Sequence, residues 1–150
     1  MSGRFFEQWQ LGDSIRHEIR RTVTETDNLL ISTLTHNTQP LHLDAEYAAA
    51  SEFGRILVNG TFTFALMVGL SVGDTTQGTL IANLGYDKVV MPHPVFIGDT
   101  LRAETEVVAL RPSQSRPTAG IVTFHNRALN QNDLLVCHCL RMALVKRLPA

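Results

Sequence analysis

The chain has 150 residues, of which 44% are hydrophobic and 18% are charged, which suits one domain with a packed core and argues against disorder. Its formal net charge of −1 gives no strongly basic face, so nucleic acid is not expected as a partner. The N-terminal stretch "MSGRFFEQWQ" lacks the basic-then-apolar pattern of a signal peptide, and no apolar run approaches the roughly 18 residues of a membrane span. We therefore expect one cytoplasmic domain over residues 1–150, with no membrane partner.

The first third of the chain predicts one strand followed by two short helices. The stretch "LGDSIRHEIRRTVTE" is typical of a turn followed by a short strand. "TETD" at residues 24–27 has the spacing of a capping box, with Asp in place of the usual Glu or Gln. Apolar residues follow, which predicts a helix from about Thr24 to Leu34. Asp44 is suited to cap another short helix through "AEYAAASEF".

The stretch "GTFTFALMVGLSVG", residues 60–73, is the most informative element because it contains no charged residue. It is apolar on every side at helical spacing, which predicts a helix that is buried all round. At this length the helix is too short to span a bilayer. The rest of the chain must therefore wrap around it.

The remaining stretches predict antiparallel strands. "TLRAETEVVAL", residues 100–110, alternates between apolar and charged residues, as a half-buried strand does. "AGIVTFHNRAL" and the more uniformly apolar "LLVCHCLRMALV" follow, with "NQND" at residues 130–133 as a hairpin turn between them. "TLIANLGYDKVVMP" predicts a further strand that stops at "PHP", because proline cannot donate to a strand ladder.

These elements fit an α+β fold in which a curved antiparallel sheet wraps around one long buried apolar helix. A lone subunit would leave part of so apolar a helix uncovered, and pairing through the sheet edge or the helix would cover it. We therefore expect a homodimer or a higher homo-oligomer.

The two cysteines are interpreted as core residues. Cys137 and Cys139 fall on one face of a predicted strand, with His138 on the other, so one metal ion could not easily collect all three. Neighbours on one strand face are also poor disulfide partners. Arg141 falls on the same face, where it must reach a sheet edge or pair with a buried acid. No zinc motif or phosphate-binding loop appears, so neither a metal nor a cofactor is predicted.

A central helix in an antiparallel sheet, with "QPLHLD" before it and "VNG" at its start, resembles the hotdog fold. The stretches "PLHLDAEYAA", "FGRILVNGTF" and "MPHPVFIGDTLRAETEVVAL" narrow the resemblance to the MaoC-like dehydratases, which include the (R)-specific enoyl-CoA hydratases. The resemblance covers nearly the whole chain. "FTFALMVGLSVGDTTQGTLIANLG", "SRPTAGIVTFHNRALNQ" and "TVTETDNLL" look like single-domain hydratases of itaconyl-CoA and mesaconyl-CoA, thioesters of C5 dicarboxylic acids. This resemblance implies a carbon–oxygen lyase that acts on an acyl-CoA thioester.

Adding water to a double bond conjugated to a thioester requires a proton acceptor and fixed donors aimed at the thioester oxygen. His42 is suited to accept the proton, because an unperturbed imidazole titrates near pH 6.5. The family pattern has Asp five residues before this histidine, whereas here Asn37 stands at that position. Asn cannot accept a proton but can hold a water molecule. We therefore expect His42 to be the sole proton acceptor and Asn37 to orient the water, unless a carboxylate elsewhere or on the substrate replaces the Asp.

The oxyanion donor implied by the resemblance is the backbone N–H of Gly60. It lies at the first turn of the apolar helix, where free N–H groups and the helix dipole converge. Glycine also lets a thioester approach closely. Asn59 either caps this helix or adds a side-chain donor to the site, and the sequence leaves both open.

Three further residues are weaker candidates. His36 is suited to bind a substrate carboxylate, and Arg116 a carboxylate or a CoA phosphate, although each also fits an ordinary surface residue. His93, between two prolines, more often shapes a strand end than touches a substrate.

Four functions compete. The first is a hydratase or dehydratase for a short enoyl-CoA with a second carboxylate, and the second is a general (R)-specific enoyl-CoA hydratase for straight acyl chains. A thioesterase ranks lower, because it needs a carboxylate or an ordered water near the thioester carbon. A non-catalytic acyl-thioester-binding module would keep the pocket but would not depend on His42.

Overall fold

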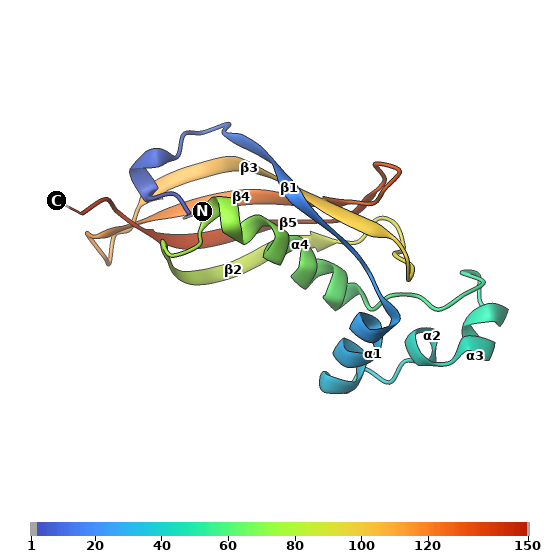
Figure 1. Ribbon diagram of the computed structural model, residues 1–150. Coiled ribbons are helices and arrows are strands. Elements are labelled where there is room, and N and C mark those ends of the chain that lie inside the picture. Colours follow the sequence, from blue (N-terminus) through green and yellow to red (C-terminus); the bar gives the residue numbers. More distant parts are fainter. Residues whose placement is uncertain (1–2, 150) are drawn as a thin grey trace.

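The sheet is antiparallel, and a long helix lies against one of its faces (Figure 1). Within residues 3–149, which the computed structural model describes, five strands pair in the order β1-β3-β4-β5-β2. The strands are β1 (Ser14–Thr22), β2 (Leu80–Val90), β3 (Thr100–Pro112), β4 (Ala119–Leu129) and β5 (Leu135–Lys146). The helical elements are η1 (Phe6–Gln8), α1 (Glu25–Leu34), α2 (Pro40–Leu43), α3 (Ala45–Ala50) and α4 (Gly60–Thr75). The predicted α+β fold is confirmed.

Helix α4 is the predicted apolar helix, and it packs against β1, β3, β4 and β5. Met67, Leu70 and Ser71 are buried on the side that faces the sheet. A stripe on its other side, at Ala65 and Gly69, is exposed. The prediction that this helix is buried all round is therefore wrong for one chain. A single sheet covers only one side of a helix, and nothing else in the described chain covers the other.

The core lies between α4 and the sheet and divides into two main clusters. One cluster surrounds Met67, in the middle of α4, and contains both cysteines. The other surrounds Phe124 and Trp9, whose rings meet edge to face with their centroids 5.1 Å apart. Burial raises the pKa of the Cys137 thiol to about 12 and that of the Cys139 thiol to about 11. Both cysteines are thus buried neutral thiols, as the sequence predicts.

Local capping explains where the short helices begin. The Thr24 hydroxyl accepts from the N–H of Asp27 at 3.2 Å, and the Asp27 carboxylate accepts from the N–H of Thr24 at 2.8 Å. This is the predicted capping box, with Asp in the third position. The Asp44 carboxylate accepts from the N–H of Tyr47 at 3.0 Å and caps α3, also as predicted.

Arg141 is a fully buried cation whose hydrogen-bond partners are all neutral. Its guanidinium donates to Oδ1 of Asn83 at 2.8 Å, to Oγ1 of Thr76 at 2.9 Å and, at a longer 3.4 Å, to Oγ of Ser71. Burial lowers the pKa of this guanidinium from its ordinary value. Of the two expectations for Arg141, the buried acid is wrong; the guanidinium instead reaches Asn83 on the edge strand β2 and hydroxyls at the C-terminal end of α4.

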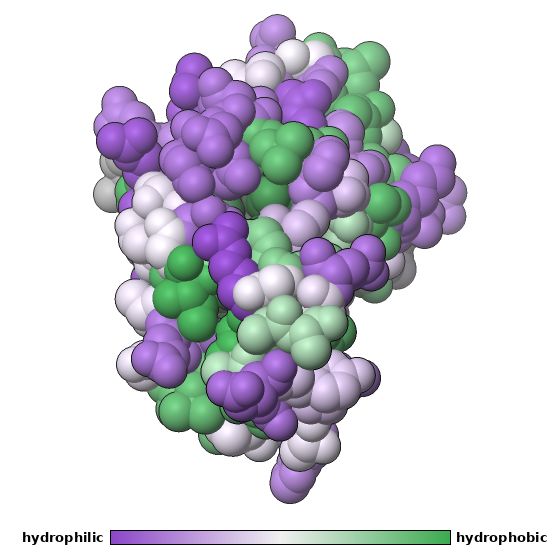
Figure 2. Space-filling model, turned by 90° about the vertical axis from the view of Figure 1, so that its right-hand side faces the viewer, coloured by the Kyte–Doolittle hydropathy of each residue, from purple (hydrophilic) through white to green (hydrophobic). Residues whose placement is uncertain are grey.

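Two apolar surfaces remain uncovered in one chain. The edge strand β2 exposes Leu84 and Val90, and α1 exposes Leu30 and Leu34. Figure 2 shows hydrophobic side chains scattered among polar ones at the end of the molecule that carries α1, α2 and α3. Within residues 3–149, no helix combines the length and the hydropathy that crossing a bilayer would require.

Candidate active site

His42 lies in α2, a single helical turn that Pro40 begins. Its ring is half-buried, and Nδ1 lies 2.8 Å from the carbonyl oxygen of Leu57. A carbonyl oxygen can only accept, so Nδ1 carries the proton and the neutral ring has its lone pair on Nε2. The structure therefore holds His42 in the tautomer that a proton acceptor needs.

Asn28, which the sequence analysis missed, joins His42 to the start of α4. Its side-chain amide donates to the carbonyl oxygen of His42 at 3.1 Å and to that of Leu57 at 3.5 Å. Its Oδ1 accepts from the N–H of Asn59 at 2.8 Å. Asn28 is 1% exposed. The only signal in the sequence is a polar residue on the buried side of a short helix, which does not reveal its partners.

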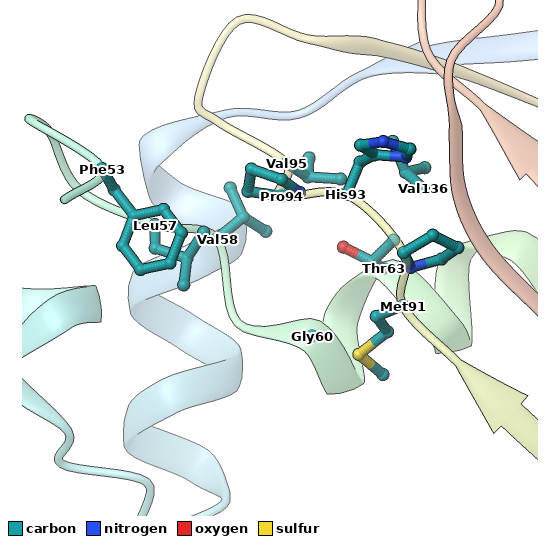
Figure 3. Close-up of a pocket in the computed structure, with 11 residues that line it drawn as sticks. Phe53, Leu57, Val58, Gly60, Thr63, Met91, His93, Pro94, Val95 and Val136 are labelled. Carbon is teal, nitrogen blue, oxygen red and sulfur yellow. The ribbon is translucent and has the colours of Figure 1, made fainter.

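Gly60 is the first residue of α4 and borders a cavity of about 350 Å³ (Figure 3). Within the described chain, no acceptor lies within hydrogen-bonding distance of its backbone N–H. The Sδ atom of Met91 lies close above it, only 2.4 Å from where a Cβ at Gly60 would stand. The absence of a side chain therefore lets another group come close to a free N–H at the positive end of a helix.

Asn59 is the N-cap of α4. Its Oδ1 accepts from the N–H of Thr61 at 3.0 Å and from the Thr61 hydroxyl at 2.6 Å. Its Nδ2 lies 3.4 Å from Oγ of Ser32, and the residue is 1% exposed. The structure thus shows Asn59 as a cap with both ends of its amide engaged, and direct contact with a substrate stays a prediction.

His42 is not among the residues that line the cavity beside Gly60; it lines a separate, small cavity of about 60 Å³, together with Glu25. Asn28, Leu29 and Ile97 are among the other residues around it, whereas Asn37 is not. The Oδ1 of Asn37 accepts instead from the N–H of Gln39, at 3.3 Å. The carboxylate that shares a cavity with His42 is therefore Glu25, which the sequence analysis did not single out.

The other candidates lie further from these groups. His36 is exposed in the turn after α1 and has a positive φ of 56°. Arg116 is exposed in the turn between β3 and β4, at the opposite end of the molecule from α1, α2 and α3 (Figure 1). Within one chain the structure does not bring Arg116 to Gly60 or His42. Its role in binding a substrate stays a prediction that needs a second copy of the chain.

His93 lines the same cavity as Gly60, on the segment between β2 and β3. Its Nδ1 lies 2.9 Å from the carbonyl oxygen of Leu135, at the start of β5. The ring therefore anchors the end of a strand, as the sequence analysis expects, and it also borders the cavity. As in His42, the bond to a carbonyl leaves Nε2 free to accept from a ligand or, when protonated, to donate to one.

Comparison with known proteins identifies the family of this chain. The family described as MaoC like domain matches residues 6–126. The chain is 35% identical to a mesaconyl-CoA hydratase from Cereibacter sphaeroides, over 97% of this chain and 42% of that protein. It is 38% identical to an (R)-specific enoyl-CoA hydratase from Aeromonas caviae, over 60% of this chain and 64% of that protein.

Solved structures share the fold over nearly the whole chain. A protein from Archaeoglobus fulgidus described as a monoamine oxidase regulatory protein superposes with a TM-score of 0.87 at 33% identity, covering 99% of this chain and 98% of that one. A Mycobacterium tuberculosis protein described as having a double hotdog fold superposes with a TM-score of 0.87 at 24% identity, covering 98% of this chain and 45% of that one. The chain therefore has the hotdog fold, and it spans less than half the length of the mesaconyl-CoA hydratase that it matches.

Proposed function

Because this chain belongs to the MaoC-like domain family, we propose that it is a hydratase that adds water reversibly to the double bond of an enoyl-CoA thioester. The proposed substrate is a C5 dicarboxylic thioester of the mesaconyl-CoA or itaconyl-CoA type. The likeness to a mesaconyl-CoA hydratase over 97% of the chain supports this choice. The observation that carries the proposal is the hydrogen-bond network through Leu57 and Asn28, which connects a tautomer-locked His42 to the start of α4, where the N–H of Gly60 is free.

In the proposed reaction, Nε2 of His42 accepts a proton from water as the oxygen attacks C3. Negative charge then develops on the thioester oxygen, and the N–H of Gly60 stabilises it as the enolate forms. The protonated ring returns its proton to C2. Leu57 accepts from His42 and lies three residues before Gly60, so one short segment positions both the acceptor and the donor.

Glu25 and Asn37 have separate parts in this proposal. Glu25 supplies the carboxylate that, with His42, faces the small cavity in which a water molecule would be held. Asn37 orients water or shapes the approach to α2 through its bond to Gln39. The alternative kept from the sequence is that a substrate carboxylate takes the place of the missing Asp. Asn37 would not repel that anion, whereas an Asp would.

We further propose that the enzyme is a homodimer or a higher homo-oligomer. The chain covers 42% of the mesaconyl-CoA hydratase and 45% of the double hotdog protein, so a second copy would stand where those chains continue. The exposed apolar side chains of edge strand β2 and the uncovered stripe of α4 are surfaces that such a copy would bury. A second copy would also be the source of an Arg116 close to the site.

The direct test is a hydration assay with mesaconyl-CoA, itaconyl-CoA and crotonyl-CoA, followed by loss of enoyl absorbance. We expect turnover of the dicarboxylic thioesters and a fall of about a hundredfold or more in kcat for His42→Ala. His138→Ala, on the face of β5 opposite to the two buried cysteines, is a matched control for the loss of an imidazole outside the site. Near-wild-type hydration by His42→Ala would remove His42 from the reaction, and release of free thiol would indicate a thioesterase.

One observation favours the second function, a general (R)-specific enoyl-CoA hydratase for straight acyl chains. The cavity beside Gly60 is bordered mainly by apolar side chains such as Val58, Val95 and Val136, which suit a hydrocarbon chain. The likeness to an (R)-specific enoyl-CoA hydratase over 60% of the chain supports the same function. Faster turnover of crotonyl-CoA than of both dicarboxylic thioesters would select it.

A further inference from the structure

The cavity beside Gly60 has few polar side chains, and they come from two elements. Most of its lining is aliphatic, aromatic or proline. The side-chain groups that can form strong hydrogen bonds there belong to Thr63 on α4 and His93 on the segment after β2. In so apolar a cavity, a small number of fixed polar groups decides which substrates are accepted.

Thr63 is 2% exposed, yet no hydrogen bond within the described chain involves its hydroxyl. Figure 3 shows the hydroxyl oxygen pointing into the space between Val58, Pro94 and Gly60. The other buried helical hydroxyls behave differently: that of Thr75 donates to the carbonyl oxygen of Ser71 at 2.6 Å. Because Thr63 lines the cavity, its hydroxyl is open to a partner from the cavity, either water or a polar group of a ligand.

Thr63 stands one turn after Gly60 on the same side of α4. Three residues of helix advance about 4.5 Å along the axis. In itaconyl and mesaconyl thioesters, three carbon–carbon bonds of about 1.5 Å each separate the thioester carbon from the second carboxyl carbon. An acyl chain that runs from the Gly60 N–H along α4 would therefore bring that carboxylate level with Thr63.

His93 offers the second polar group. Its Nδ1–H is committed to the carbonyl oxygen of Leu135, so only Nε2 is available to the cavity. When Nε2 carries a proton, it is a charge-assisted donor to a carboxylate. The two groups come from different elements and border one cavity, so both are available to a carboxylate bound there.

We propose that Thr63 and His93 form a polar subsite that binds the second carboxylate of a dicarboxylic acyl thioester. This proposal rests on the proposed hydratase function and names the residues that select its substrate. In this subsite the carboxylate binds to the chain that also supplies Gly60, and neither His36 nor Arg116 is needed. It accepts a carboxylate three carbon–carbon bonds from the thioester carbon and disfavours a methyl group at that point.

The test compares mesaconyl-CoA with crotonyl-CoA, which has a methyl group where the second carboxylate would be. Thr63→Val keeps the shape of the side chain and removes the hydroxyl, and His93→Gln removes the ionisable ring. We expect the ratio of kcat/KM for mesaconyl-CoA to that for crotonyl-CoA to fall about tenfold to a hundredfold in each variant. Thr75→Val removes a buried hydroxyl at the far end of the same helix and should leave the ratio as in the wild type.

Binding of saturated analogues separates the subsite from the reaction. Isothermal titration calorimetry with succinyl-CoA and butyryl-CoA measures the preference for a carboxylate without turnover. We expect the wild type to prefer succinyl-CoA and Thr63→Val to lose that preference. If the wild type prefers succinyl-CoA but hydrates no enoyl-CoA, the proposed hydratase function is wrong and the subsite stands. An unchanged ratio of Kd values in both variants, or an equal loss for both thioesters, overturns the subsite.

Discussion

The side-chain amide of Asn28 donates to the carbonyl oxygen of His42 at 3.1 Å, across fourteen residues of sequence. The oxygen of the same amide accepts a hydrogen bond from the N–H of Asn59, so one buried side chain connects α1, α2 and the start of α4. The distance between the proposed proton acceptor and the proposed oxyanion donor therefore depends on Asn28. A positioning role of this kind can be tested because the residue itself does not touch the reacting atoms.

Asn28→Leu should remove these bonds while keeping a similar volume. We expect kcat to fall about tenfold or more while KM changes little, because a displaced base slows the reaction more than it weakens binding. Nitrogen-15 spectra of the histidine rings should also show His42 losing its single tautomer. Ser32→Ala is the control, since it removes only the 3.4 Å contact to Asn59. A variant with normal kcat and an unchanged His42 tautomer would contradict the role.

Glu25→Gln tests which residue replaces the family Asp. If the carboxylate beside His42 helps to hold the attacking water, kcat should fall about tenfold to a hundredfold, since Gln lacks the negative charge that faces that water. Asn37→Ala should have a smaller effect, because its side chain bonds to Gln39 and does not border that cavity. Steady-state kinetics on both variants shows which of them has the larger loss of kcat. A larger loss of kcat for Asn37→Ala than for Glu25→Gln would show that Asn37 orients the water.

Gly60→Ala keeps the backbone N–H but adds a Cβ that would stand 2.4 Å from Sδ of Met91. Met91 must then shift into the space where a thioester would approach, so we expect kcat/KM to fall about tenfold or more. Thermal unfolding should change little, because a methionine end can move. Gly73→Ala lies in the same helix, where its nearest atom would be 3.7 Å away, and is the matched control. Equal kcat/KM in the two variants would remove Gly60 from the site.

Arg141→Lys should destabilise the fold without touching the site. A lysine carries all its donors on one nitrogen, whereas Arg141 bonds to Asn83 and Thr76 through two different nitrogens, so both bonds are not kept. We expect the free energy of unfolding to fall by about 2 kcal/mol, the usual scale for lost hydrogen bonds to a charged group. Urea denaturation measures it, with the exposed Arg111→Lys as control. A loss equal to that of the control would mean that the buried network contributes nothing.

The capping box of α1 should make stability depend on acid. Burial acts to raise the pKa of Asp27, but hydrogen bonds from Arg21 and Thr24 outweigh it, so the pKa lies below the ordinary value. A carboxyl whose pKa is lowered by folding stabilises the protein above its unfolded pKa, near 3.9, and this contribution is lost as pH falls further. Urea midpoints of the wild type and Asp27→Asn should therefore differ at pH 6 and converge as pH falls below about 4. A constant difference would refute the linkage.

Local patterns were sufficient to predict most elements. The alternation along β3 is confirmed, with Leu101, Ala103 and Val107 buried. The capping box at Thr24 and the cap at Asp44 are also where the sequence predicts them. These features depend on residues a few positions apart, so periodicity and capping rules contain the information needed.

The parts that could not be predicted depend on contacts distant in sequence. Nothing in the local pattern places Asn28 beside Leu57, or Glu25 in a cavity with His42. Arg141 was expected to find an acid or an edge, because a buried charge usually does, and only the fold reveals the neutral oxygens around it. The free hydroxyl of Thr63 has the same origin, since its sequence neighbours do not indicate where it points.

The burial of both cysteines has a practical consequence for labelling. Cys137 and Cys139 are the two cysteines of the chain, and neither forms an exposed thiolate at neutral pH. Maleimide reagents should therefore leave the folded native chain unmodified. A cysteine introduced at the exposed Gln114 would then be the one reactive group, ready for a spin label. Pulsed electron paramagnetic resonance between two such labels would report directly how neighbouring copies are arranged.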